Sequence, residues 1–453
     1  MILPNYFLAD LPPEATLTAQ TISDACDTLK RNREQYLARR TTAQMVRLIG
    51  GLAENWLQPD FPFRRFALEH GPAATGFPRA TLARGLDAFF SELTPDNLHA
   101  LLVQEFGHAH RLDELCATPA EVKQQRAALV RAPLLLAHVT SGNIPVPAIQ
   151  SIVFGLLLRS AQFVKCARGS SFLPRIFAHS LYEADSKAAA CLEIAEWPGG
   201  DIALEAPLFV AADCVTATGS DEMLADVRVR LPRAKRLVGY GHRVSFGYIT
   251  REVLAGYGVK KVIGRAVEDV IAWNQLGCLS PHLFFVESGG AVSPDGFAEL
   301  LATELARAEA DEPRGEVGVE IAAGIASRRD VFRLRAAASD ETRLWCSDGS
   351  TAWTVVFEAD ARFQLSCLHR FVHVKAVGGI EDALQHADTV RDHVSTVGLA
   401  AQDDRAQEIA LTLARWGATR VCPLGQMQRP PLAWRHDGRP ALGDWVEWID
   451  WEQ

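Results

Sequence analysis

A regular alternation of short apolar runs and helical patterns, which begins near Ala132, constrains the fold of this chain most strongly. APLLLAHV (132–139) is predicted to be a buried strand, AIQSIVFGLLLRS (148–160) a buried helix and AQFVKCA (161–167) a second strand. A strand, a helix and a strand within roughly 35 residues predict a parallel βαβ unit, because parallel neighbours need a crossover connection. The pattern continues to about residue 250 and predicts a doubly wound sheet.

A second α/β region is predicted from about residue 255. Its expected strands are HLFFVES (282–288), TAWTVVFEAD (351–360) and LHRFVHVKAV (368–377), and its expected helices are 264–277, 294–310, 380–392 and 404–417. Before residue 130, a helix is predicted within 16–40 and loops at 59–64 and 70–79. Residues 206–219 are expected to contain one strand or a pair of strands.

The composition excludes several classes of protein. Of 453 residues, 48% are hydrophobic and 22% charged, as in globular proteins. The net charge is −9 and no long basic run occurs, so no nucleic-acid partner is expected. Nine cysteines without a CxxC pair favour a reducing cytoplasm over a disulfide scaffold or a metal site. The most apolar stretch, 144–158, is shorter than the roughly 18 residues of a membrane span, and the N-terminus lacks a basic signal-peptide region.

Cys278 is the first candidate for chemistry. It follows a predicted helix and Gly277, and it precedes a Ser280–Pro281 turn and a buried strand. A cysteine on such a loop can present its sulfur to a cleft, whereas a cysteine within an apolar strand cannot. A small structural cysteine would occupy the same position without a function, so the position alone leaves both interpretations open.

Other polar residues follow predicted strands, where open α/β sheets bind their ligands. Asn143 lies in a turn before a helix, and its side-chain N–H could stabilise an oxyanion, although a helix cap needs the same residue. Lys165 ends the next strand and Arg168 follows three residues later; the two cations suit a ribose or a phosphate, although a solvated loop would also contain them.

A third predicted strand ends at Thr218, Gly219 and Ser220 and leads into a helix whose N-terminal amides could face a pyrophosphate. Ordinary capping of that helix explains these three residues equally well.

Together these residues resemble a known superfamily. Asn143, Lys165, Gly219 and Cys278 follow one another at intervals of 22, 54 and 59 residues, an order similar to that of the aldehyde dehydrogenases. Within this superfamily, the chain is most similar to the LuxC-type acyl-CoA reductase (fatty acid reductase) family, and the similarity extends from about residue 100 to the end. Three segments carry it: SGNIPVPAIQS (141–151), NQLGCLSP (274–281) and RHDGRPALGDWVEWID (435–450).

The resemblance implies an aldehyde-dehydrogenase-like α/β fold with two doubly wound α/β domains and a small oligomerisation element. We expect an N-terminal helical region with an NADP-binding domain in 1–253, a catalytic domain in 254–425 and a C-terminal tail in 426–453. Because the tail is rich in tryptophan, it is expected to dock on the fold or on a partner surface. The chain is expected to be a homo-oligomer.

Two segments depart from the superfamily pattern. Aldehyde-oxidising members carry a water-activating Glu where this chain has Val-Gly-Tyr-Gly-His-Arg (238–243), which contains no carboxylate. Without this carboxylate, water attacks the thioester more slowly, so the thioester survives long enough to be reduced. His242 is a candidate proton-handling residue, and a structural histidine is equally compatible. The segment that usually contacts the nicotinamide ribose has Cys-Leu-His-Arg-Phe (367–371) in its place.

The function implied by the resemblance is NADPH-dependent reduction of a fatty acyl thioester to the aldehyde through an acyl-Cys278 intermediate. Asn143 would help to bind the oxyanion, and Lys165 and Arg168 would favour NADPH. The acyl donor would be an acyl-CoA or an acyl carrier, with an acyl-protein synthetase or ligase as a candidate partner. The alternatives are a reversible CoA-acylating or semialdehyde dehydrogenase, a cofactor-independent acyl transferase or thioesterase, and a non-catalytic subunit.

Overall fold

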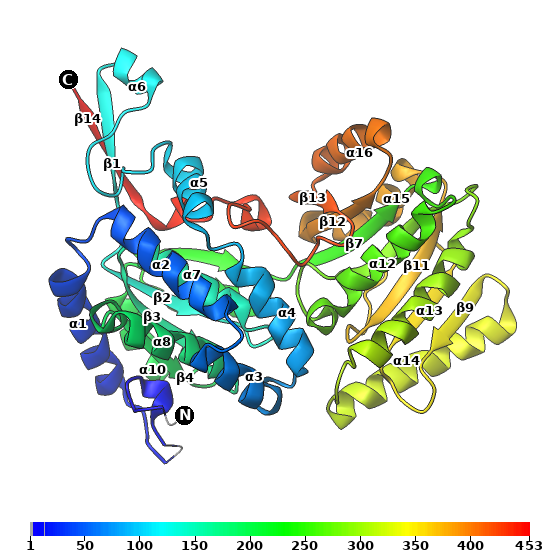
Figure 1. The fold of residues 1–453 in the computed structure, drawn as a ribbon, viewed down its shortest axis with the longest axis horizontal. Helices are drawn as coiled ribbons and strands as arrows, with labels where there is room; N and C mark the ends of the chain where they lie inside the picture. Colours follow the sequence, from blue (N-terminus) through cyan, green and yellow to red (C-terminus); the bar gives the residue numbers. More distant parts are fainter. Residues whose placement is uncertain (1–2, 13) are drawn as a thin grey trace.

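The computed structural model describes residues 3–12 and 14–453, and two parallel sheets dominate it (Figure 1). The first sheet is fully parallel, and its strand order β4-β3-β2-β5-β6 places the earliest strand in the centre. Its strands are β2 (Leu135–Val139), β3 (Ala161–Cys166), β4 (Leu192–Glu196), β5 (Cys214–Thr218) and β6 (Arg236–Tyr240). The predicted doubly wound α/β architecture is confirmed.

Helices cover both faces of the first sheet (Figure 1). One face packs against α1 (Ala19–Tyr36), α10 (Ile202–Ala211) and α11 (Asp221–Arg230). The other face packs against α7 (Val146–Leu157) and α8 (Phe172–Ala184), with the short α9 (Ser186–Ala189) after them. The N-terminal helices add a further layer over α7 and α8: α2 (Thr42–Leu57), α3 (Pro62–Thr75), α4 (Arg79–Phe90) and α5 (Pro95–Phe106). We call this assembly the first domain.

The second domain is built on a seven-stranded sheet of order β13-β12-β7-β8-β11-β10-β9, in which only β9 is antiparallel to its neighbour. Its strands are β7 (Val244–Ile249), β8 (Pro281–Glu287), β9 (Thr342–Cys346), β10 (Thr354–Glu358), β11 (Phe371–Val377), β12 (Val394–Ala400) and β13 (Arg420–Pro423). Its helices are α12 (Gly258–Ile271), α13 (Pro294–Asp311), α14 (Val319–Ala338), α15 (Ile380–His386) and α16 (Asp403–Trp416).

Two predictions about local structure differ from the structure. The predicted boundary at 253–254 falls after β7, because β7 pairs with β8 and β12 of the second sheet. The segments predicted as loops at 59–64 and 70–79 largely form α3, which tolerates Pro62 at its first position. The strand expected within 206–219 is β5, whereas 206–211 belong to α10, because Asp201 caps this helix and its apolar face packs on the first sheet.

The C-terminal tail crosses from the second domain back over the first (Figure 1). Glu105 on α5 accepts hydrogen bonds from the amides of Leu442 and Gly443 at 3.0 and 2.9 Å, and Trp445 is buried beneath them. The last strand, β14 (Glu447–Glu452), pairs antiparallel with β1 (Arg126–Arg131), next to the short α6 (Pro119–Lys123), and this pair projects from the first domain. The tail therefore docks on the body of the fold, and its role in oligomerisation stays a prediction.

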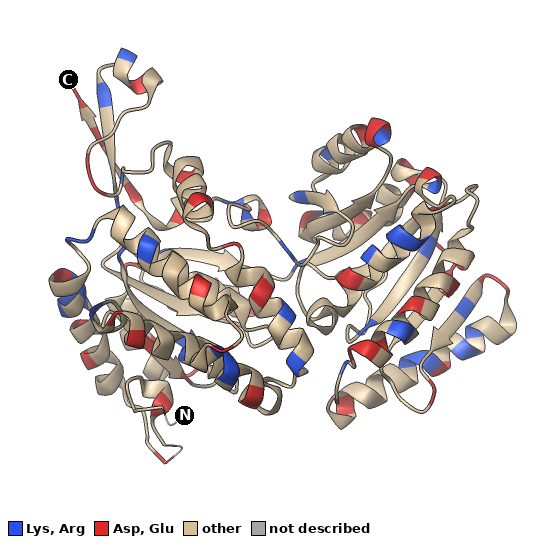
Figure 2. Cartoon of the chain, viewed as in Figure 1, with Lys and Arg blue, Asp and Glu red and all other residues tan. Residues whose placement is uncertain are grey.

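Charged residues of both signs are interspersed over the two domains (Figure 2). Within the described part of the chain, every helix is too short or too polar to cross a lipid bilayer. The cytoplasmic location stays a prediction.

His138, in the centre of β2, gives the first testable prediction. Its buried ring lies between Thr216 Oγ1 at 2.7 Å and Gln162 Oε1 at 3.2 Å, and burial lowers its pKa from 6.5 to about 4. Between these values the unfolded chain binds a proton that the folded chain does not, so stability falls as the pH drops through this window. From pH 7 to pH 5, we expect wild type to lose about 2 kcal/mol more unfolding free energy than His138→Gln. Urea unfolding at both pH values tests this, and equal losses in the two proteins would contradict it.

Candidate active site

Cys278 lies in the second domain, on the loop between the short helix η3 (Ala272–Gln275) and β8. Its carbonyl accepts a hydrogen bond from Ser245 Oγ at 2.8 Å, which ties the loop to β7. The Cys278 side chain is exposed, whereas most of the other cysteines are buried. The exposed position of Cys278 agrees with the prediction that this loop makes its sulfur accessible.

The electrostatic surroundings of Cys278 favour a neutral thiol. Cys278 faces a cleft between protein walls, where desolvation raises the pKa of its thiol to about 12, with a further increase from the carboxylate of Asp437. Arg243 and the backbone amides of Cys278 and Leu279 act in the opposite direction and lower the thiol pKa. Neither amide donates a hydrogen bond elsewhere in the described residues, so both are free to face an oxyanion.

The cleft at Cys278 is an apolar pocket of about 870 Å³, part of it open to solvent. Helix α7 forms one wall, and the C-terminal tail forms another. The tail contributes six of the described lining residues: Gln428, Pro430, Trp434, His436, Ala441 and Trp445. No Asp or Glu occurs among the described residues that line the pocket. The pocket therefore suits a long apolar group whose reactive end lies at a thiol.

The backbone before Cys278 is strained. Trp273, Asn274 and Gln275 have φ values of 50°, 51° and 66°, in the left-handed region that non-glycine residues rarely adopt. A second left-handed run, 368–370, precedes β11 with φ values of 60°, 54° and 65°. Each such residue costs about 1–3 kcal/mol, so tertiary contacts must hold both runs in place.

Arg370 joins the two strained runs. This fully buried side chain donates from Nε to Asn274 Oδ1 at 3.1 Å and from Nη1 to Glu309 Oε2 and the Glu312 carbonyl, both at 2.8 Å. Gln275, also buried, donates to backbone carbonyls at the starts of β8 and β11 at 2.7 and 2.8 Å. The loop that carries Cys278 is thus held by charged and amide side chains beneath it.

Asn143 and His242 are placed near the pocket but outside its lining. Asn143 is exposed on the β2–α7 loop, and the next residue, Ile144, lines the pocket. His242 is exposed on the link between the sheets, and its backbone N–H donates to Asp221 Oδ1 at 3.1 Å. Neither side chain forms a hydrogen bond with Cys278 within the described residues, and both assignments stay predictions.

The predicted nucleotide-binding residues lie at the carboxyl ends of β3 and β5. Lys165 is buried, its Nζ lies 5.9 Å from the centre of the Trp197 ring, and its ammonium group forms no hydrogen bond within the described residues. Desolvation lowers its pKa, and the charge of Glu205 partly offsets that effect. Arg168 is exposed and likewise forms no hydrogen bond there. Two cations without hydrogen-bond partners fit a ribose and a phosphate, so a nicotinamide dinucleotide is compatible with this sheet edge.

At the carboxyl end of β5, the ligand-binding and the capping interpretations each agree with part of the structure. Thr218 lines the pocket, so this strand end and the candidate nucleophile meet in one cavity. Ser220 caps α11 by accepting the Met223 N–H at 3.2 Å, as the capping interpretation requires. Gly219 lies against Met223, whose methyl group would be 2.1 Å from a Cβ at position 219.

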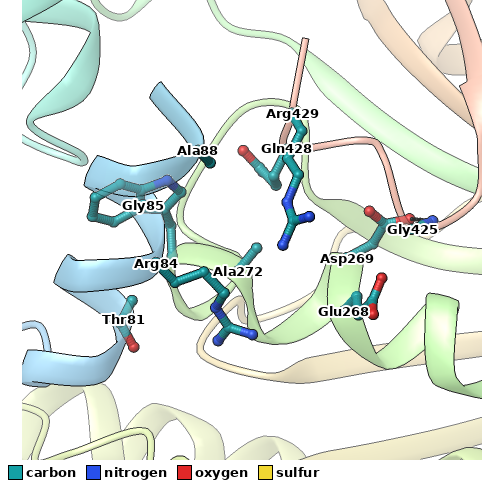
Figure 3. Close-up of a pocket in the computed structure, with 11 residues that line it drawn as sticks. Thr81, Arg84, Gly85, Ala88, Glu268, Asp269, Ala272, Gly425, Gln428 and Arg429 are labelled. Atoms are coloured by element: carbon teal, nitrogen blue, oxygen red, sulfur yellow. Dashed lines mark hydrogen bonds between the residues drawn. The ribbon is translucent and has the colours of Figure 1, made fainter. Parts of the chain in front are cut away.

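A second, smaller pocket of about 420 Å³ adjoins the first between α4 and α12. Both pockets share Trp273 and Gln428. Figure 3 shows Arg84 from α4 and Arg429 from the tail directed into the same space. Gly85 leaves room for the Trp273 ring, because a Cβ there would lie 2.0 Å from it. Charged side chains line the smaller pocket, whereas the Cys278 pocket is apolar.

Comparison with known proteins identifies the family. The sequence profile described as acyl-CoA reductase (LuxC) matches residues 37–448. The chain belongs to the LuxC acyl-CoA reductase family. A long-chain acyl-protein thioester reductase of Aliivibrio fischeri is 20% identical over 420 residues, 90% of this chain and 82% of that protein. Another, long-chain acyl-protein thioester reductase 2 of Photobacterium leiognathi, is 20% identical over 322 residues, and the match spans 70% of this chain but only 63% of that relative.

The fold of this LuxC-family chain is that of the aldehyde dehydrogenases, as the resemblance predicted. The structure of an NAD-dependent benzaldehyde dehydrogenase from Corynebacterium glutamicum superposes with a TM-score of 0.69 at 15% identity. The superposition covers 99% of this chain and 92% of that chain.

Sequence reasoning missed the tail residues of the LuxC-family pocket. From the sequence, the RHDG segment (435–438) is interpreted as part of a docking tail that also carries the family resemblance, yet His436 lines the same pocket as Cys278. One sequence signal points to these residues: His436 and Asp437, an adjacent titratable pair, lie in a tail rich in tryptophan.

Proposed function

We propose that this chain reduces long-chain fatty acyl thioesters to aldehydes with NADPH, through an acyl thioester on Cys278. The observation that carries the proposal is the apolar pocket, which contains an exposed cysteine and lacks a carboxylate among its described lining residues. Because the described lining has no carboxylate that could activate water, hydrolysis of the acyl-enzyme is disfavoured. The LuxC family assignment supports the same reaction.

The donor in this proposal is an acyl-CoA or a protein-bound acyl group. The relatives from Photobacterium leiognathi and Aliivibrio fischeri are described as acting on long-chain acyl-protein thioesters. We therefore include an acyl-protein partner, such as a synthetase or ligase that carries the acyl group, among the sources.

The protein's own residues would act at three points. The apolar pocket holds the acyl chain with its carbonyl at Cys278, whose sulfur attacks the carbonyl carbon as thiolate. The free amides of Cys278 and Leu279, with the Asn143 side chain, stabilise the oxyanion, each donor contributing about 3 kcal/mol. Lys165 and Arg168 bind the adenosine end of the cofactor. Bound NADPH supplies the hydride that converts the acyl carbon to the aldehyde level.

The direct test is an assay of the full chain with acyl-CoA thioesters of graded length and with NADPH or NADH. We expect NADPH consumption matched by aldehyde formation, with activity that increases with chain length. Release of free acid without NADPH consumption would identify a thioesterase instead. Absence of both activities, together with absence of NADPH binding by fluorescence, would overturn the proposal.

Chain-length selectivity gives a prediction about the pocket. Ser151 lies on the pocket face of α7, and a phenylalanine there would occupy the volume of several methylenes. Excluding three to four methylenes at about 0.8 kcal/mol each is expected to lower kcat/KM for long acyl thioesters about 100-fold. Short acyl thioesters should react nearly as before, which serves as the internal control. An equal loss for all lengths would place the acyl chain elsewhere.

The proposed phosphate site predicts opposite changes in the KM for NADPH when Arg168 or Glu196 is replaced. Glu196 accepts the Gly169 and Ser171 amides at 2.7 and 3.1 Å, so a carboxylate lies beside the loop that carries Arg168. Arg168→Ala is expected to raise KM for NADPH about tenfold and leave KM for NADH unchanged, because only NADPH has a 2′-phosphate. Glu196→Gln should lower KM for NADPH by removing charge repulsion. Steady-state kinetics with both cofactors tests this, and equal effects on both would contradict our assignment of the phosphate site.

A further inference from the structure

His436 is the one histidine among the described residues that line the Cys278 pocket. Its ring is stacked on Tyr240, with centroids 4.5 Å apart and an interplanar angle of 13°, and lies 4.6 Å from the Trp434 ring on its own segment. Neither ring nitrogen forms a hydrogen bond within the described residues, although the side chain is only 29% exposed. The imidazole is therefore held in place with its proton-binding positions free.

The carboxylate of Asp437 lies beside this histidine. Its Oδ1 lies 3.8 Å from His436 Nε2 and accepts a hydrogen bond from Ser395 Oγ at 3.1 Å, and its Oδ2 lies 3.4 Å from Arg243 Nε. The Asp437 side chain is 3% exposed, and its backbone has φ +53° and ψ 34°, a left-handed conformation. A buried carboxylate in strained backbone beside a pocket histidine is typical of a functional site.

The strands of the second sheet bring the Asp437 and Cys278 loops together. Ser245 at the start of β7 donates to the Cys278 carbonyl and accepts the Thr396 N–H of β12 at 3.2 Å. Ser395, the residue before Thr396, holds Asp437. Neighbouring strands thus anchor the loop with the thiol and the loop with the His-Asp pair at the same sheet edge.

We propose that His436, oriented by Asp437, is the general base that removes the proton from Cys278 and returns it to the departing thiol. The inference rests on the proposed function and names a proton-handling residue for it. It places this role on the tail instead of on His242, which lies outside the pocket lining.

The step is redox-neutral and balanced. The imidazole accepts the proton of the Cys278 thiol, and the sulfur forms a bond to the acyl carbonyl carbon. The bond between that carbon and the donor sulfur breaks, and the imidazolium gives the proton to the departing thiolate. The products are acyl-Cys278, the free donor thiol and a neutral His436.

The charges around His436 suit this role. Burial lowers its pKa, the carboxylate of Asp437 raises it and the guanidinium of Arg243 lowers it. Tyr240, which packs on the ring, is neutral, because burial raises the pKa of its phenol to about 12. Arg439 lies with its guanidinium carbon 5.9 Å from the centre of the Tyr240 ring and adds positive charge. A neutral imidazole near pH 7 is the form that accepts a proton from a thiol.

The experiment measures acylation alone, without reduced cofactor. Full-length enzyme is mixed with an acyl-CoA, and acyl-Cys278 is followed by intact mass and CoA release after rapid quenching, from pH 6 to pH 10. His436→Gln is expected to slow acylation about 100-fold at pH 7. The deficit should shrink as the pH rises toward the thiol pKa, because the thiolate then forms without a base. Asp437→Asn should show a smaller deficit of the same shape.

Two comparisons make the result decisive. His110→Gln, at an exposed histidine outside the pocket, controls for loss of an imidazole, and unfolding midpoints control for folding. Alkylation of Cys278 by iodoacetamide should show the same pH-dependent deficit in His436→Gln. A wild-type acylation rate in this variant, a deficit independent of pH, or a deficit only in His242→Gln would overturn the inference. If wild type forms no acyl-enzyme, the proposed function fails instead.

Discussion

Replacing Cys278 with serine is expected to lower acyl-thioester reduction by about 10³-fold or more and to prevent formation of the acyl-enzyme. A serine hydroxyl is far less ionised than a thiol and is the weaker nucleophile toward a thioester. NADPH binding should stay near normal, because it depends on residues at the first sheet. Stopped-flow reduction, intact mass and fluorescence titration measure the three quantities.

The matched control for this substitution is Cys346→Ser. Cys346 is half-buried on β9, which lies at the far edge of the second sheet. We expect this variant to keep full activity. Reduction at a near wild-type rate in Cys278→Ser would place the nucleophile at another cysteine and would remove the basis of the proposed mechanism.

Arg370→Met is expected to destabilise the second domain by about 3 kcal/mol. The fully buried guanidinium pairs with Glu309 and holds Asn274, and removal of one partner of a buried ion pair leaves the other without compensation. Burial already lowers the pKa of Arg370 to about 10, and its contacts with Glu309 and Glu312 oppose that effect. Urea unfolding measures the loss.

The same substitution should affect catalysis beyond stability. Without Arg370, the strained run 273–275 is free to relax, and Cys278 three residues later loses its position. We expect at least a tenfold lower acylation rate under conditions where the variant is folded. Arg343→Met removes an exposed pair with Asp295 at 3.1 Å and should cost less than about 1 kcal/mol with no change in rate. Similar effects of both substitutions would show that Arg370 has no special role.

Local sequence patterns determined much of the fold and part of the candidate site. The βαβ unit of β2, α7 and β3 follows from apolar runs and spacing within one short segment. The exposure of Cys278 follows from its place between a helix, Gly277 and a turn. The capping role of Ser220 also depends on neighbouring residues alone. In these cases the interactions that decide the structure connect residues close together in the chain.

Only the tertiary structure decided which segments meet. The assignment of β7 to the second sheet depends on pairing with β12, about 150 positions later, and such a partner leaves no local pattern. The pocket walls come from α7 and the tail, almost 300 positions apart, so His436 could not be placed beside Cys278 from spacing. The left-handed backbone before Cys278 is held by tertiary contacts, among them the hydrogen bond from Arg370, about 100 positions later, to Asn274. Composition and periodicity reflect which secondary structure each short segment prefers. A site between two domains depends on contacts between distant segments, and these contacts form only when both sheets have folded.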